Sequence, residues 1–244
     1  MTDPAWGTVD AYLESKLLPH DPVLEACLRT SAEAGLPNIQ VSPIQGRLLY
    51  LVAKSIGARR ILEVGTLGGY SATWLARALP AGGRLVTLEI NSKHAEVART
   101  NFARAGLTEK VEVRLGPALE TFPRLAAEGA GPFDLFFLDA DRPNNRAYLD
   151  WILRLSRVGS VLMVDNVVRR GEVADSTSDD PSVRGVREMI DTLAAEDRVS
   201  ATAIQTVGKK GYDGFLLARV ERPTPDGLRG GVEGVRPANE DPPR

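Results

Sequence analysis

The chain has 244 residues and a mass of 26.3 kDa, and its charge is nearly balanced, with 30 lysines and arginines against 32 aspartates and glutamates. A 43% share of hydrophobic residues with 25% charged residues is ordinary for a globular protein and excludes a wholly disordered chain. The net charge of -2 lacks the basic excess of nucleic-acid-binding proteins, and the apolar run at residues 48–53 is far too short to span a membrane.

Cysteine usage and the N-terminal residues indicate a compartment. The single cysteine, Cys27, excludes an internal disulfide framework and is typical of a reducing environment. Residues 1–4 carry no basic segment and no apolar stretch follows them, so we expect no secretory signal peptide. Together these features predict a cytoplasmic protein without a membrane-spanning segment.

Short apolar runs alternate with helical patterns from residue 60 to residue 164. Nearly continuous apolar strands, each followed by a helix, are typical of a parallel sheet that is covered on both faces. The second expected helix has Asp21 as its N-cap, Pro22 at its first position and Gly35 after its end. The expected helices are 9–18, 23–34, 45–56, 71–79, 92–105, 119–128, 145–155 and 183–195, and the expected strands are 60–65, 84–90, 111–115, 133–138, 160–164, 200–206 and 214–220.

The last two strands are joined through Gly208-Lys-Lys-Gly211, which indicates an antiparallel edge on the parallel sheet. The predicted fold class is therefore α/β, a doubly wound (Rossmann-like), mostly parallel seven-stranded sheet with an antiparallel last strand and extra N-terminal helices. We divide the chain into N-terminal helices at 1–58, the α/β domain at 59–220, and a tail at 221–244 whose composition is typical of disorder.

A glycine-rich turn follows the first strand, in Glu63-Val-Gly-Thr-Leu-Gly-Gly-Tyr-Ser71. Glycines let the backbone turn tightly and approach a ligand, and the next helix points its N-terminus at the same place. The spacing is not Gly-x-Gly-x-x-Gly and no lysine follows, which disfavours a dinucleotide dehydrogenase and a phosphate-binding loop. The second strand ends at Glu89, whose carboxylate either accepts both hydroxyls of a ribose or is simply an acid at a strand end.

Acidic side chains follow two later strands, in Asp139-Ala-Asp-Arg142 and in Asp165-Asn166. Either cluster alone is explained by helix capping or a turn. Neighbouring parallel strands, however, bring Asp139, Asp165 and Asn166 around one point. Three oxygen ligands without cysteine or histidine suit a hard cation such as Mg²⁺, so the two clusters together favour a metal site.

The glycine turn, Leu85-Val-Thr-Leu-Glu89 and Leu115-Gly-Pro-Ala-Leu-Glu120 resemble the cofactor motifs of class I S-adenosylmethionine-dependent methyltransferases, and more narrowly the cation-dependent catechol and caffeoyl-CoA O-methyltransferase family, from about Asp10 to Val220. The resemblance implies S-adenosylmethionine as cofactor, bound by the 59–220 domain, with lid and dimer elements in 1–58. It places the methionine carboxylate on Val41 and Ser71 and the ribose on Glu89. It also implies Glu63, Gly65, Thr66 and Asp139 on the methionine side, Ala118 beside the adenine, and Asp139, Asp165 and Asn166 as ligands of Mg²⁺ or another divalent cation.

One departure from the family concerns Arg142, which stands where the family commonly has a lysine assigned as the base. Arginine stays protonated at ordinary pH and cannot accept a proton. We hypothesise that Arg142 stabilises the ionised acceptor electrostatically, with Asp139 as the other catalytic residue. The predicted activity is methyl transfer to a hydroxyl of a small aromatic vicinal diol of the catechol or caffeoyl type, by a homodimer.

Two other functions stay open from the sequence. A branch of the same family methylates hydroxyuridine in tRNA, although the acidic total argues against a nucleic-acid partner. A non-catalytic S-adenosylmethionine-binding protein is disfavoured because it has no use for the acidic clusters. We expect His20 and His94 to be plain surface residues, and the loop 167–181 to be either a lid or merely solvated. Gly211-Tyr-Asp-Gly214 resembles an Asp-Gly of the family near the acceptor, but we favour a hairpin turn there.

Overall fold

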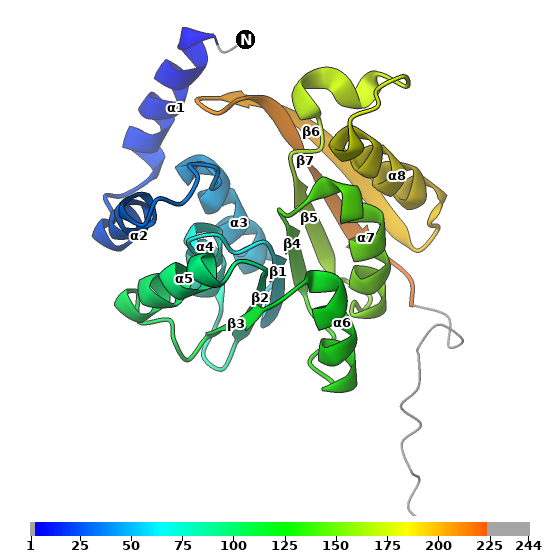
Figure 1. Ribbon diagram of the computed structural model, residues 1–244, viewed down its shortest axis with the longest axis horizontal. Coiled ribbons are helices and arrows are strands. Elements are labelled where there is room, and N and C mark those ends of the chain that lie inside the picture. The colour runs from blue at the N-terminus through cyan, green and yellow to red at the C-terminus, as the bar shows by residue number, and fades with distance from the viewer. Residues whose placement is uncertain (1–2, 224–244) are drawn as a thin grey trace, which may run out of the picture.

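A seven-stranded mixed sheet forms the centre of the protein (Figure 1). The computed structural model describes residues 3–223, so most of the tail expected at 221–244 lies outside the described residues. The strand order is β3-β2-β1-β4-β5-β7-β6, and β7 runs antiparallel to its neighbours. The strands are β1 (Arg60–Val64), β2 (Arg84–Glu89), β3 (Val111–Leu115), β4 (Leu135–Leu138), β5 (Val161–Asp165), β6 (Val199–Gly208) and β7 (Gly211–Val220).

The central strands are buried on both faces, which is why their sequences are almost continuously apolar. On β1, successive side chains point to opposite faces. Ile61 packs in the hydrophobic cluster on one side of the sheet, and Leu62 and Val64 pack in the cluster on the other. Glu63 shares its face with Ile61, so the strand carries a carboxylate into the core on that side.

Helices cover both faces of this sheet, with α3, α4 and α5 on one side and α6, α7 and α8 on the other (Figure 1). Their starts follow capping rules, because Asp21, Asn91 and Asp180 each accept backbone N–H groups at a helix N-terminus, and Ser42 forms a capping box with Gln45. The helices are α1 (Pro4–Leu17), α2 (Pro22–Glu33), α3 (Pro43–Ser55), α4 (Tyr70–Ala78), α5 (Ser92–Arg104), α6 (Ala118–Ala127), α7 (Asn145–Arg154) and α8 (Pro181–Ala195), with short 3₁₀ turns η1 (Arg142–Asn144) and η2 (Arg169–Ala174).

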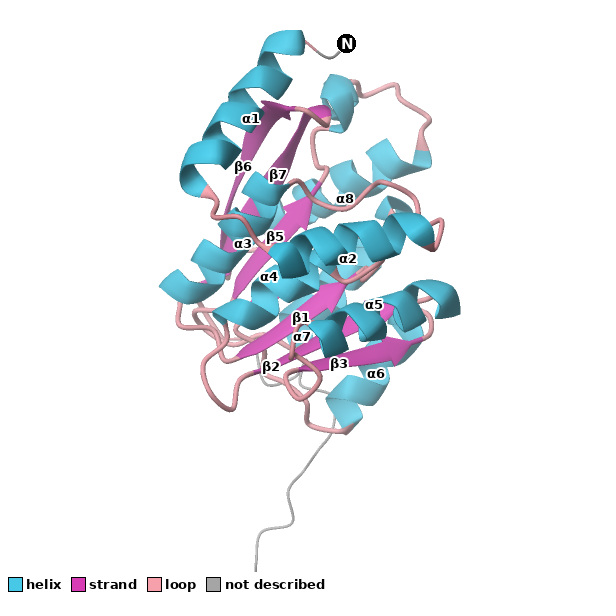
Figure 2. Cartoon of the chain, turned by 90° about the vertical axis from the view of Figure 1, so that its left-hand side faces the viewer, coloured by secondary structure: helices cyan, strands magenta, loops and turns pink. Residues whose placement is uncertain are grey.

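The β6–β7 hairpin extends beyond the sheet and reaches α1 (Figure 2). Asp10 and Glu14 of α1 bind Lys209 at the hairpin tip, so the N-terminal helix is attached to the far edge of the sheet. Among residues 3–223, no helix has the length and hydropathy that crossing a bilayer requires.

The predicted fold class is confirmed, including the antiparallel last strand. The main differences are at element ends. Helix α1 begins at Pro4 rather than residue 9, because Asp3 caps it and Pro4 occupies a first-turn position. The hairpin strands are longer than expected because they pair with each other from Val199 to Val220. The strand order reverses between β1 and β4, because β2 and β3 follow β1 on one side of the sheet and β5 follows β4 on the other. A ligand site is expected at the carboxyl ends of these two strands.

Candidate functional site

The turn after β1 depends on two glycines. Gly65 has φ +96°, and a Cβ atom there would lie 2.0 Å from the carbonyl oxygen of Asp139, so only glycine allows the ends of β1 and β4 to approach. Gly69 is the N-cap of α4 with φ +81°, and no described side chain caps that helix. The first N–H groups of α4 therefore face the site and are available to an anionic ligand.

Glu89 ties the end of β2 to this turn. One carboxylate oxygen accepts the backbone N–H groups of Thr66 at 3.2 Å and Leu67 at 2.8 Å, and the other accepts that of Asn91 at 2.9 Å. These bonds hold Leu67 in a left-handed conformation, with φ +48°. A carboxylate has about four lone-pair sites, so Glu89 keeps acceptor capacity for a ligand.

Glu63 lies behind the turn and is completely buried. It accepts hydrogen bonds from Ser71 Oγ at 2.6 Å and from Thr87 Oγ1 at 2.5 Å. Burial raises the pKa of Glu63 to about 8, although these two hydrogen bonds oppose the rise. Glu63 therefore positions Ser71 from within the core.

A cavity of about 700 Å³ lies above this turn. The expected cofactor residues that line it are Val41, Gly65, Thr66, Ser71, Glu89, Ala118 and Asp139, whereas Glu63 lies behind its wall. His94 also lines the cavity, with Nδ1 3.6 Å from a Glu89 oxygen, so the expectation of a plain surface residue was wrong for His94. The other histidine, His20, is exposed beside Glu25, as expected.

The acidic clusters meet at the ends of β4 and β5. The guanidinium of Arg142 donates to Asp139 Oδ1 at 2.9 Å and to the amide oxygen of Asn166. Burial and then the charge of Asp139 raise the pKa of Asp165 to about 7. Burial also raises the pKa of Asp139, against the opposing charges of Arg142 and Lys210. The charge of Asp139 thus disfavours ionisation of Asp165, so the two carboxylates lie close enough to interact.

This donor set fits a divalent cation. Two carboxylates and one amide oxygen are hard ligands, and a cation would relieve the repulsion between Asp139 and Asp165. Within residues 3–223 there is no group of three or more histidine, cysteine, aspartate or glutamate side chains arranged to hold a metal, so any ion needs Asn166 or water to complete its coordination. Arg142 currently shares the Asn166 oxygen, and an ion would compete with it for that oxygen.

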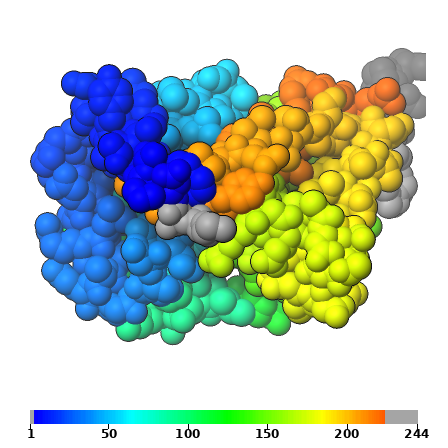
Figure 3. Space-filling view, turned by 90° about the horizontal axis from the view of Figure 1, so that it is seen from above, coloured from blue at the N-terminus to red at the C-terminus, as the bar shows by residue number. Residues whose placement is uncertain are grey.

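A second cavity, of about 830 Å³, adjoins the first, and the two share Ile39, Asn166 and Arg169. Part of the loop 167–181 lines it, including residues of η2, so this part of the loop forms a cavity wall, and a lid stays a prediction. Figure 3 shows that loop, coloured yellow-green, beside the orange hairpin and the dark blue α1.

The hairpin turn that we favoured at Gly211–Gly214 is wrong, whereas the predicted connection through Gly208–Gly211 is confirmed. The turn is at Lys209–Lys210, and Gly211–Gly214 already belongs to β7. The Asp213 carboxylate instead accepts the backbone N–H groups of Val168 and Arg169, at 3.0 and 3.1 Å. Asp213 therefore fixes the loop after β5 and also lines the second cavity.

Two further residues near the site are not indicated by the sequence. Lys210 lines the second cavity from the hairpin tip. Gly185 of α8 lies against η1, where a Cβ atom would be 2.1 Å from the carbonyl oxygen of Arg142. Both depend on contacts between distant segments, and no local motif marks either residue.

Known proteins resemble this chain along most of its length. A family model described as O-methyltransferase matches residues 14–220. Catechol O-methyltransferase of Mycobacterium tuberculosis is 53% identical over 87% of this chain and 94% of that protein, and catechol O-methyltransferase of Niastella koreensis is 49% identical over 91% and 100%. The crystal structure of the O-methyltransferase from Bacillus cereus in complex with SAH has a TM-score of 0.88 and 54% identity, covering 89% of this chain and 99% of that one. The chain therefore belongs to the O-methyltransferase family, as the resemblance of its motifs implied.

Proposed function

We propose that this protein transfers the methyl group of S-adenosylmethionine to one hydroxyl of a small aromatic vicinal diol, with a divalent cation such as Mg²⁺. The observation that carries the proposal is that two cavities meet at Asn166 and Arg169, beside the paired carboxylates of Asp139 and Asp165. The first cavity is large enough for the cofactor and contains the glycine turn, and we assign the second cavity to the acceptor. The names of two relatives, both catechol O-methyltransferases, support this choice of acceptor.

The first cavity supplies complementary groups for each part of the cofactor. The methionine carboxylate would meet the uncapped N-terminus of α4 together with Ser71 and Val41. Glu89 would accept the ribose hydroxyls, and Ala118 would lie beside the adenine. The SAH bound to the Bacillus cereus protein supports this assignment.

The acceptor must ionise before it reacts. A phenol with a pKa of ~10 is about one part in a thousand ionised at pH 7, which corresponds to roughly 4 kcal/mol. A divalent cation held by Asp139, Asp165 and Asn166 would lower this cost as a Lewis acid. Arg142 adds a permanent positive charge at the same place, and it cannot itself take the proton.

In the transfer, the acceptor oxygen forms a bond to the methyl carbon while the carbon–sulfur bond breaks and its electron pair stays on sulfur. The product thioether is neutral, so the leaving group needs no general acid. The chain's own contribution is orientation: the turn at Gly65 brings the end of β1 against Asp139, so cofactor and acceptor are held at adjoining positions.

The test is methyl transfer from labelled S-adenosylmethionine to a panel of small catechols, with Mg²⁺ and with EDTA. We expect turnover with Mg²⁺ that EDTA abolishes and added Mg²⁺ restores. The Asp165→Asn variant should lose turnover but still bind the cofactor in calorimetry. Cofactor binding without turnover on any diol would contradict the proposed acceptor, and absence of cofactor binding would contradict the proposal as a whole.

A further inference from the structure

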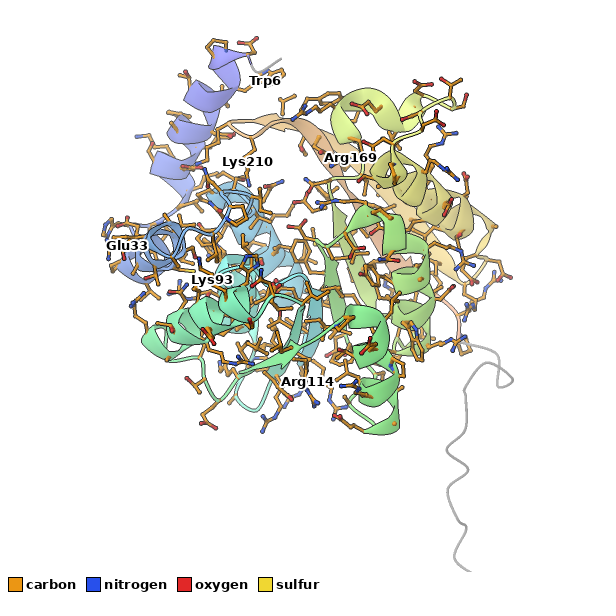
Figure 4. All side chains as sticks on the ribbon, viewed as in Figure 1. Trp6, Glu33, Lys93, Arg114, Arg169 and Lys210 are labelled. Carbon is orange, nitrogen blue, oxygen red and sulfur yellow. The ribbon has the colours of Figure 1, made fainter. Side chains whose placement is uncertain are left out.

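The second cavity contains cationic side chains that the proposed reaction leaves without a role. Lys210 lies at the tip of the β6–β7 hairpin and Arg169 in the loop after β5, and both line this cavity. Figure 4 shows the two labelled residues in the upper half of the view, below the hairpin tip and α1 on one side and η2 on the other.

Lys210 differs from its neighbour Lys209 in its partners. Lys209 is held by α1, because its backbone N–H donates to Asp10 at 2.7 Å and its ammonium lies 2.5 Å from Glu14. Lys210 is exposed at the cavity and has no hydrogen bond or ion pair with any residue from 3 to 223. The walls around it lower the pKa of its ammonium, while the charges of Asp139 and Asp165 oppose this. The anchored neighbour thus fixes the backbone of Lys210 at the cavity, within electrostatic reach of the two carboxylates.

Arg169 is held in an unusual conformation at the boundary of the two cavities. Its φ is +54° and that of Arg170 is +58°, in the left-handed region that is strained for any residue other than glycine. Asp213 maintains this conformation by accepting the Val168 and Arg169 backbone N–H groups. The Nε atom of Arg169 is buried and has no hydrogen-bond partner among the described residues. Such a donor is expected to have a ligand.

The acids of the same cavity are mostly engaged elsewhere. Asp10 accepts the Lys209 N–H, Asp180 caps α8 and also lies within electrostatic reach of Arg169, and Asp213 binds the loop backbone. Glu172 and Arg170 are both exposed and oppose each other in charge. Asp165, which also lines this cavity, is assigned with Asp139 to the divalent cation, so the charge left for the acceptor is positive and comes from Lys210 and Arg169.

We propose that the acceptor carries a carboxylate in addition to its diol, and that Lys210 and Arg169 bind this carboxylate. The inference rests on the proposed function and narrows its substrate class to acids of the dihydroxybenzoate or dihydroxycinnamate kind. A carboxylate bound at the hairpin side, with the diol at Asp139 and Asp165, also limits which hydroxyl faces the cofactor. Lys210 is thus a specificity-determining residue rather than a catalytic one.

The test compares acceptors that share one diol and differ in charge: 3,4-dihydroxybenzoate, its neutral methyl ester and the cationic dopamine. For Lys210→Met we expect KM for the benzoate to rise about tenfold to a hundredfold with little change in kcat, as for a lost hydrogen bond to a charged group. KM for the ester should change less than about twofold. Lys210→Arg should restore most of the benzoate KM. Lys54→Met, which alters an exposed lysine of α3 that lines neither cavity, should leave the ratio of the two KM values unchanged.

Binding gives a second readout without turnover. Titration of 3,4-dihydroxybenzoate into the protein with S-adenosylhomocysteine and Mg²⁺ should show the same loss of affinity in Lys210→Met. Equal effects of that variant on the benzoate and the ester would overturn the carboxylate assignment, as would a wild-type preference for the ester or dopamine. In both cases diol methylation itself would stand. If no diol is methylated, the proposed function fails and this inference fails with it.

Discussion

Arg142 and Asn166 are joined directly, because the guanidinium of Arg142 donates a hydrogen bond to the side-chain oxygen of Asn166. The same guanidinium nitrogen lies 2.9 Å from Asp139 Oδ1. Two of the three oxygen groups that we assign to a divalent cation are therefore already engaged by a fixed positive charge. We therefore expect the arginine in place of the family's usual lysine to affect cation binding as well as the acceptor.

Replacing Arg142 by Met is expected to slow methyl transfer at least tenfold, because a charge-assisted contribution of about 1.5–3 kcal/mol to the ionised acceptor is lost. Affinity for Mg²⁺ should increase, since the Asn166 and Asp139 oxygens lose a competing cation. Steady-state kinetics and Mg²⁺ titration calorimetry measure the two effects. Cofactor affinity is the control and should stay the same. An unchanged transfer rate would remove Arg142 from the mechanism.

Replacing Glu89 by Ala is expected to weaken cofactor binding about tenfold to a hundredfold. The variant loses the acceptor for the ribose and the three backbone hydrogen bonds that shape the glycine turn. Calorimetry with S-adenosylhomocysteine measures the loss. Glu96→Gln, an exposed acid on the neighbouring helix α5, is the matched control. Equal affinity in Glu89→Ala and wild type would show that the carboxylate serves neither purpose.

The sequence predicts those residues of this site that directly follow the end of a strand. The turn at Gly65 and the acids Glu89, Asp139 and Asp165 follow buried strands directly, and parallel strands bring their carboxyl ends to one edge. His94 could have been predicted in the same way, because the helix that begins at Ser92 places His94 in its first turn, directly after Glu89. Without that placement, a single histidine in a helix indicated only a surface residue.

The remaining features depend on contacts between distant segments. Lys210 and Asp213 reach the site because the hairpin folds over the loop after β5, and no local pattern encodes that meeting. The close approach of Gly185 to Arg142 likewise depends on tertiary packing, here of α8 against η1. The homodimer stays a prediction and the tRNA acceptor stays the alternative, because both concern partners that a single chain does not contain.

Stability without cofactor is expected to fall as pH rises from about 4.5 to about 8, in part because of Glu63. Burial raises the pKa of this carboxyl from 4.5 to about 8 in the folded protein, so over that range the folded state binds a proton that the unfolded state has released. Each rise in pH therefore favours unfolding. Thermal midpoints measured from pH 5 to pH 8 should decline in wild type and decline less in Glu63→Gln.

A residual slope should remain in Glu63→Gln, since the pKa of Asp165 is also raised, to about 7, and contributes in the same direction. Parallel pH profiles for wild type and Glu63→Gln would show that Glu63 is ionised in the folded protein. That result would contradict the assignment of a neutral carboxyl behind Ser71.

Replacing Gly185 by Ala is expected to destabilise the protein and to impair transfer. The added methyl would lie 2.1 Å from the Arg142 carbonyl oxygen and 2.9 Å from Pro143 Cα, so α8 and η1 must separate. Overpacking of this kind costs about 1–3 kcal/mol, and the displacement moves Arg142 away from Asp139 and Asn166. Thermal unfolding and the transfer rate, measured at a temperature where the variant is folded, separate the two effects.

The matched control is Gly7→Ala, since Gly7 also lies within a helix and no described heavy atom comes within 4 Å of its added methyl. Alanine is the better helix former by about 1 kcal/mol, so this variant should be equally or more stable and fully active. A Gly185→Ala protein that is folded and transfers methyl at the wild-type rate would show that the position of η1 does not set the rate. Loss of rate with cofactor affinity retained would instead place the effect at Arg142, because α8 packs against η1, whereas the glycine turn and Glu89 belong to the ends of β1 and β2.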